Sequence, residues 1–139
     1  TWFDGTLDGV AKNAVTADAT ITHLMPIYDG MTIATGAGLD AAGSAAIQSS
    51  FNMTPAVAAG IGTSSVKMDV GCPNDWFSYA TVDAGLRLLT GNAVPANYGI
   101  TCKVFDESNI GSIDATVENS VNWYGIDFAA EFAKFWTAS

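Results

Sequence analysis

Apolar and polar positions along the chain follow two alternating patterns, one with helical spacing and one of short runs rich in β-branched residues. Apolar residues recur three or four positions apart at 7–14, 31–42, 77–88 and 127–136. Compact apolar runs lie at 21–26, 45–51, 66–70 and 98–105. A shorter helix is expected from Thr54 to Gly60, with Pro55 in its first turn, and 120–124 is expected to be irregular. This alternation predicts an α/β fold, a mainly parallel sheet with helices on both faces.

The longest predicted helix begins at Asn74 or Asp75, and Gly91 stands where a helix commonly ends. Its expected buried face consists of Phe77, Ala80, Thr81, Ala84 and Leu88. The terminal helix is expected to carry three apolar rings, Phe128, Phe132 and Phe135.

In open parallel sheets, ligands bind beyond the carboxyl ends of the strands. Here those loops, together with the first residues of the chain, combine aromatic rings with short polar side chains: Trp2, Phe3, Asp4, Tyr28, Asp29, Phe51, Asn52, Asn74, Asp75 and Trp76. Aromatic faces can cover the C–H face of a sugar ring, while Asp and Asn bind its hydroxyls. The set therefore favours a small neutral polyol, although core-edge rings and turn formers would give the same pattern.

Composition narrows the classes of partner. Five basic residues against 14 acidic ones give a net charge of −9, which excludes a phosphate-tracking surface for nucleic acid and disfavours anionic membranes. No apolar run reaches the roughly 20 residues that a membrane span needs. Charged residues make up only 14% of the chain, a composition typical of exported proteins.

The residues of common catalytic and cofactor sites are scarce. His23 is the single histidine, and its place inside a predicted strand favours a packed core position. Gly36 and Gly38 fall within a predicted helix, so they do not form a phosphate-binding loop. No metal and no cofactor is expected. Binding without catalysis is therefore favoured, with three alternatives: a ligand sensor, a structural protein, or an enzyme that uses Asp4, Asp29 or Asp69.

Cys72 and Cys102 leave two possibilities open from the residues alone. They could form one disulfide bond or remain two buried thiols.

Several segments together resemble the type I periplasmic sugar-binding proteins of ABC importers, of the ribose- and rhamnose-binding kind. The resemblance is strongest in 69–76 (DVGCPNDW), 84–91 (AGLRLLTG), 94–95 (VP), 105–110 (FDESNI), 123–128 (WYGIDF) and 135–136 (FW). Upstream, further matches follow in the same order as in the family: 3–4 (FD), 28–31 (YDGM), 41–43 (AAG) and 51–55 (FNMTP).

The resemblance implies that two α/β lobes, joined by three hinge strands, close on a sugar, and that the chain corresponds to the second half of such a protein. Residues 1–139 would then form a single, partial C-terminal α/β lobe. The helix at 74–91 would pack on a missing N-terminal lobe, and 100–105 would be the returning hinge strand. Because Cys72 and Cys102 fall on neighbouring hinge strands of the family, the resemblance also implies a disulfide between them.

Residue by residue, the resemblance gives each candidate a role. Phe3 or Trp2 would stack on the sugar, Tyr28 with Asp29 would bind at the first strand end, and Asn52 would replace an acidic residue. Gly71 replaces a polar hinge residue, and Asn74 or Trp76 would take over its role. The resemblance further implies an extracytoplasmic, non-enzymatic protein that delivers sugar to the permease subunits of an ABC importer.

Overall fold

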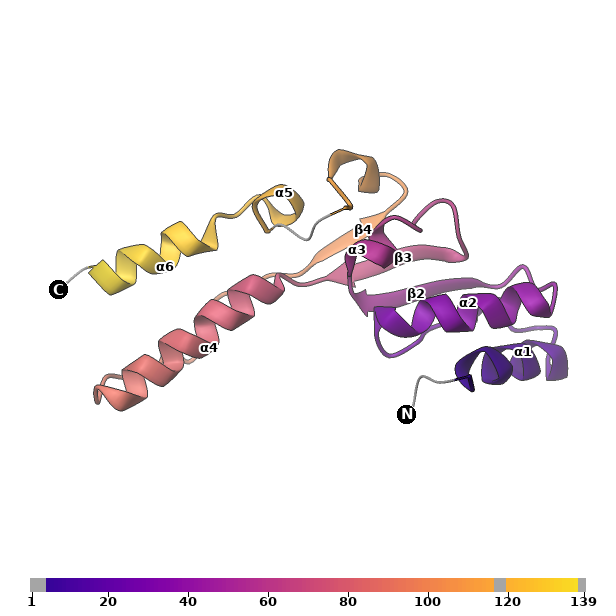
Figure 1. The fold of residues 1–139 in the computed structure, drawn as a ribbon, viewed down its shortest axis with the longest axis horizontal. Helices are drawn as coiled ribbons and strands as arrows, with labels where there is room; N and C mark the ends of the chain where they lie inside the picture. The colour runs from indigo at the N-terminus through magenta and orange to yellow at the C-terminus, as the bar shows by residue number, and fades with distance from the viewer. Residues whose placement is uncertain (1–4, 117–119, 138–139) are drawn as a thin grey trace. The chain divides into compact units, whose positions relative to one another are not determined.

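The computed structural model describes residues 5–116 and 120–137, and within it helices and strands alternate along most of the chain (Figure 1). The chain divides into two compact units, Thr1–Gly71 with Val104–Glu118, and Cys72–Lys103 with Asn119–Ser139. We call them the first and second units. No described helix has the length and apolar character needed to cross a membrane.

The first unit is built on a four-stranded sheet. Its strands are β1 (His23–Leu24), β2 (Ile47–Asn52), β3 (Val66–Gly71) and most of β4 (Lys103–Asp106), in the spatial order β1-β2-β3-β4. β1 pairs with β2 and β2 with β3, both parallel. The prediction of an α/β fold with a mainly parallel sheet is therefore confirmed.

Five short or medium helices belong to the described part of the first unit. They are α1 (Leu7–Ala17), the 3-10 helix η1 (Asp29–Met31), α2 (Thr32–Ala41), α3 (Pro55–Ala58) and the 3-10 helix η2 (Ile110–Ser112). α1 lies alongside α2 (Figure 1). Their contact requires a glycine, because a Cβ on Gly38 would lie 2.2 Å from the carbonyl oxygen of Asp8. Val15, Leu39 and Ala46 form the buried apolar cluster beside this contact.

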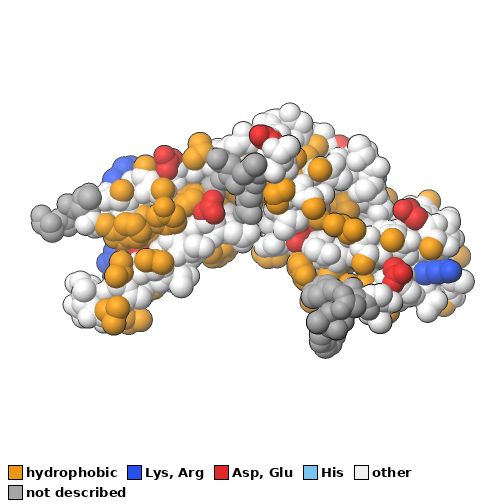
Figure 2. All heavy atoms as spheres, viewed as in Figure 1, with side chains coloured by type: hydrophobic (Ala, Val, Ile, Leu, Met, Phe, Trp, Pro, Cys, Tyr) orange, Lys and Arg blue, Asp and Glu red, His pale blue; other side chains and the backbone are white. Residues whose placement is uncertain are grey.

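The second unit consists of α4 (Asn74–Leu89), α5 (Ser120–Tyr124) and α6 (Phe128–Thr137) with the intervening loops. Hydrophobic side chains gather where α4 and α6 run together (Figure 2). Ala80, Phe128 and Phe132 are the buried centre of this contact. Beside it, the nearly buried carboxylate of Asp83 accepts hydrogen bonds from three donors, Arg87 Nε, the Tyr98 hydroxyl and Trp136 Nε1.

Cys72 and Cys102 form a disulfide bond, with their Cα atoms 4.3 Å apart. Both lie beside the points at which the chain passes between its units, after Gly71 and after Lys103. The disulfide that the family resemblance implied is thus present, and neither thiol is free.

Several details differ from the predictions. β1 has two residues instead of the run 21–26. Residues 98–102 are not a strand, because Gly99 adopts a φ of +67° and its N–H is bound by the Asn97 side chain. Residues 120–124 are helical rather than irregular, and this helix ends at Gly125 with a φ of +74°. The expected core position of His23 is wrong: its side chain is exposed and its Nε2 lies 2.9 Å from Ser49 Oγ.

The expected buried face of α4 is also partly wrong. Ala80 is buried, but Phe77, Thr81 and Leu88 are exposed. α6 instead packs on the neighbouring face that carries Trp76 and Tyr79. The apolar periodicity was correct for a helix, but both faces carry apolar residues, so spacing alone could not select the covered one.

Candidate functional site

Two of the predicted strand-end segments meet in the first unit. The main-chain N–H of Thr54, after β2, donates to Oδ2 of Asp29, after β1, at 2.5 Å. The Thr32 hydroxyl donates to the carbonyl oxygen of the same aspartate at 2.6 Å. These contacts place the segments of Tyr28 and Asn52 at one edge of the sheet, as the sequence predicts. We call Tyr28, Asp29 and Asn52 the strand-end site.

The Tyr28 ring lies over the backbone of Gly30, where an added Cβ would come within 2.6 Å of it. A glycine at this position therefore leaves room for the ring at the strand end. Tyr28 is partly exposed, so part of its surface is accessible to a ligand.

Asn52 and Met53 both have positive φ values, 109° and 57°, which are uncommon for residues other than glycine. Asn52 is partly exposed, while Met53 is fully buried. Asn52 also stands opposite Gly71 in the β2–β3 register, so no neighbouring side chain from β3 covers it. The turn thus directs the chain sharply away from β2 and leaves Asn52 at the edge of the sheet.

Two carboxyl groups lie beneath this edge, that of Asp29 from the binding prediction and that of Asp69, which the binding prediction did not include. Asp29 and Asp69 are both completely buried, and Ser50 stands opposite Asp69 in the β2–β3 register. Burial, followed by the charge of Asp29, raises the pKa of Asp69 to about 7. The sequence signal for this group was a polar run, Gln48-Ser49-Ser50, which forms the buried part of β2.

The remaining predicted residues lie elsewhere. Asn74 and Trp76 belong to the second unit, at the start of α4. The Trp76 ring stacks on Phe128, with ring centres 6.4 Å apart and planes inclined by 14°. Trp2, Phe3 and Asp4 lie outside the described residues.

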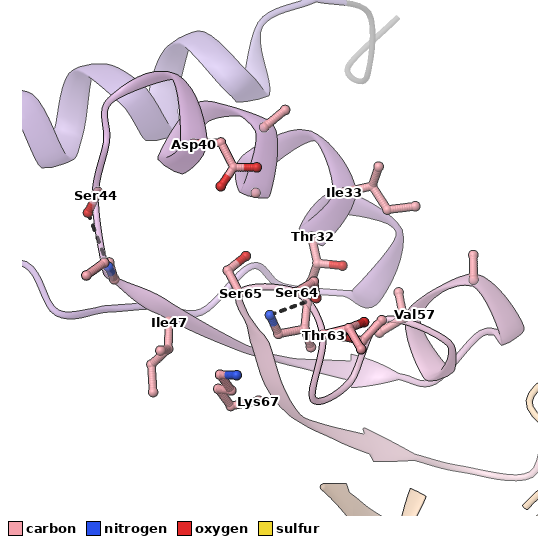
Figure 3. A pocket seen from close by; sticks show the side chains of 17 residues that line it. Thr32, Ile33, Asp40, Ser44, Ile47, Val57, Thr63, Ser64, Ser65 and Lys67 are labelled. Atoms are coloured by element: carbon pink, nitrogen blue, oxygen red, sulfur yellow. Dashed lines mark hydrogen bonds between the residues drawn. The ribbon is translucent and has the colours of Figure 1, made fainter. Parts of the chain in front are cut away.

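A wide groove of about 650 Å³ lies between α2 and α3 on the first unit (Figure 3). Small and hydroxyl side chains line it, among them Thr32, Ser64 and Ser65, with Asp40 and Lys67 at its borders. It contains none of the residues predicted from the sequence and has no aromatic ring in its lining. The groove therefore offers no aromatic ring on which a sugar could stack.

The possible metal ligands of the described residues are dispersed. No three residues among the described His, Cys, Asp and Glu are grouped so that they could hold an ion. Asp29 and Asp69 contribute only two such side chains.

Comparison with solved structures places this fold among ABC transporter solute-binding proteins. A solute-binding protein from Agrobacterium vitis with bound D-fucose matches with a TM-score of 0.69 and 18% identity, over 82% of this chain and 40% of that one. A second from Agrobacterium vitis, bound with alpha-D-tagatopyranose, matches with a TM-score of 0.67 and 14% identity, over 75% and 36%.

A third, from Actinobacillus succinogenes with bound D-allose, has a TM-score of 0.67 and 16% identity, over 76% and 37%. No protein-family model and no curated protein matches the sequence. The chain thus has the fold of part of an ABC transporter solute-binding protein, and it spans less than half the length of these structures.

Proposed function

We propose that the chain is the carboxyl-terminal part of a solute-binding protein that captures a small neutral sugar for an ABC importer. The observation that carries the proposal is the shared fold with solute-binding proteins solved with D-fucose, alpha-D-tagatopyranose and D-allose. Ligand capture then needs no catalytic group, and the protein is a carrier rather than an enzyme. Its partners are the sugar and the permease subunits.

The proposed sugar contacts are those at the strand ends. Tyr28 offers a partly exposed ring and Asn52 an amide that both donates and accepts hydrogen bonds. Asp29 has no exposed surface, so it supports the turn at Thr54 from beneath. Asn74 and Trp76 are proposed to contribute from the start of α4, and Trp2, Phe3 and Asp4 from the first residues of the chain.

The rest of the proposed protein is an N-terminal lobe. α4 exposes Phe77, Leu86, Leu88 and Leu89, a set of apolar side chains that suits packing against further protein. Residues 74–91 are accordingly proposed to pack on that lobe, with 100–105 as the returning hinge strand. The disulfide supports a location outside the cytoplasm, such as the periplasm, because such bonds persist in oxidising compartments.

Calorimetric titration of the full-length protein with D-fucose, D-allose, D-tagatose and myo-inositol tests the proposal. We expect saturable binding of at least one sugar without chemical change, and stabilisation by about 2.7 kcal/mol when the sugar is at 100 times its dissociation constant. Asn52→Ala and Tyr28→Ala should weaken that binding at least roughly tenfold, a loss of about 1.4 kcal/mol.

Asp40→Asn is the matched control, because Asp40 is exposed at the α2–α3 groove, away from the strand ends. It should leave the affinity unchanged. The proposal is overturned if none of the panel binds, or if Asp40→Asn weakens binding as much as Asn52→Ala does.

A further inference from the structure

Two carboxyl groups are enclosed at the strand-end site, that of Asp29, which belongs to the site, and that of Asp69 on β3. Asp29 and Asp69 have no exposed surface, and we call them the acid pair. Among the described residues, a hydrogen-bond donor with full geometry reaches only one of their four carboxylate oxygens: the N–H of Thr54 donates to Oδ2 of Asp29. Asp29 Oδ1 and both oxygens of Asp69 have no such donor among the described residues.

No positive charge compensates the acid pair within the described chain. Among the described residues, Asp29 is the charged group that acts on Asp69, and it acts by repulsion. Lys67, two residues before Asp69 on β3, is paired with Glu107 at 3.1 Å. His23 on β1 contacts Ser49. Because successive side chains of a strand point to opposite faces, Ser49 and Ser50 lie on opposite faces of the sheet, and His23 is on the face away from Ser50 and Asp69.

The neighbouring neutral groups do not satisfy the pair either. The Ser50 hydroxyl and the N–H of Met53 lie close enough to Asp69 to favour its charged form, but neither reaches hydrogen-bond geometry. Two ionised carboxylates so close together and away from water are strongly disfavoured. One proton on the pair removes the repulsion and gives it a donor.

The turn at 52–54 contacts both members of the acid pair. Thr54 is bound directly to Asp29, and the backbone of Met53 faces Asp69. The same turn contains the two residues with positive φ, Asn52 and Met53, a backbone conformation that persists only where its surroundings hold it. Changes in the charge of the pair therefore act on the segment that carries Asn52.

We propose that the acid pair holds one proton, and that loss of this proton displaces the turn at 52–54, so that ligand capture at the strand ends is coupled to pH. On deprotonation the O–H bond of the Asp69 carboxyl breaks, its electron pair stays on the carboxylate, and the proton passes to water or buffer. The new charge needs hydration, and water reaches it through the turn. The coupling to capture rests on the proposed sugar-binding function; the titration of Asp69 does not.

NMR spectroscopy of the full-length protein, with 13C-labelled aspartate side chains, tests the proposal without any ligand. Between about pH 5 and about pH 9 we expect the Asp69 carboxyl carbon to titrate near neutrality, far above an ordinary aspartate. The amide signals of Met53 and Thr54 should shift with the same midpoint. Asp69→Asn should abolish these amide shifts, whereas Asp40→Asn, which changes an exposed acid on α2, should leave them intact.

Three results would overturn the proposal: titration of Asp69 in the ordinary acidic range, amide signals that do not follow it, or a midpoint that moves with added calcium or sodium chloride. The last would assign the charge balance to a bound cation. Calorimetry with D-allose, D-fucose and D-tagatose then tests the coupling, with affinity expected to fall at least roughly threefold from about pH 6 to about pH 8. An affinity that is equal at both pH values overturns the coupling. If no sugar binds at either pH, the proposed function is contradicted. The NMR titration still decides in that case whether Asp69 holds a proton.

Discussion

The N–H of Thr54 donates a hydrogen bond of 2.5 Å to the carboxylate of Asp29, a residue 25 positions earlier in the chain. This bond connects the segments that follow two neighbouring strands, β1 and β2. Because the carboxylate is buried, this contact fixes where the turn after β2 ends. The segment that carries Asn52 therefore depends on a residue that a ligand would not touch.

Asp29→Ala should destabilise the protein by about 1–3 kcal/mol, because it leaves the Thr54 N–H without its acceptor in a partly buried position. Asp29→Asn keeps an acceptor oxygen at the same place and should lose less than half as much. Urea unfolding followed by circular dichroism measures both. Equal losses in the two variants would show that the hydrogen bond is not the source of the stability.

The raised pKa of Asp69 predicts the pH dependence of folding. In the unfolded chain the carboxyl releases its proton near its ordinary pKa of 3.8, whereas in the folded protein it does so at about 7. The folded state therefore binds the proton more tightly, and stability should fall as the pH rises between these values and level off above about 7.

The total loss from this group should be about 2–4 kcal/mol, and Asp69→Asn should remove the slope. Thermal unfolding of both proteins across this pH range measures it, and Asp40→Asn should retain the slope. Stability of the unaltered protein that rises with pH over the same range would contradict the assignment.

The disulfide between Cys72 and Cys102 encloses a loop with a sequence separation of 30. In the chain-entropy description, closing such a loop stabilises the folded state by about 3–4 kcal/mol. Cys72→Ser combined with Cys102→Ser should lower the free energy of unfolding by that amount. A reductant should have the same effect on the unaltered protein and none on the double variant.

Gly38 and Gly85 form a matched pair of helical glycines. A Cβ at Gly38 would meet the Asp8 carbonyl oxygen at 2.2 Å, whereas a Cβ at Gly85 would meet nothing within 4 Å. Gly38→Ala should therefore destabilise by about 1–3 kcal/mol by forcing α1 and α2 apart. Gly85→Ala should instead stabilise by up to about 1 kcal/mol through helix propensity. Differential scanning calorimetry distinguishes the two, and a neutral Gly38→Ala would contradict the close contact.

The order of helices and strands could be predicted from the sequence because it rests on local periodicity and on Gly and Pro. The meeting of the Tyr28 and Asn52 segments could also be predicted, since parallel strands place their carboxyl ends at one edge. Asp69 was predicted only as one possible catalytic acid. A single aspartate in a strand does not reveal its partner, and its pairing with Asp29 arises from the register of strands far apart in sequence.

The exposure of Phe77 and Leu88 could not be predicted for a different reason. Apolar residues occur on more than one face of α4. The buried face is the one that α6 covers, and α6 begins about forty residues later in the chain. His23 was misplaced because its strand is only two residues long. Periodicity over so short an element does not determine which side is covered.

α4 lies wholly between Cys72 and Cys102, so the disulfide joins the segment before this helix to the segment that follows it. A protease that cut once inside this interval would release no fragment. The nicked protein would keep its full mass plus one water under oxidising conditions, and two pieces would separate only after reduction.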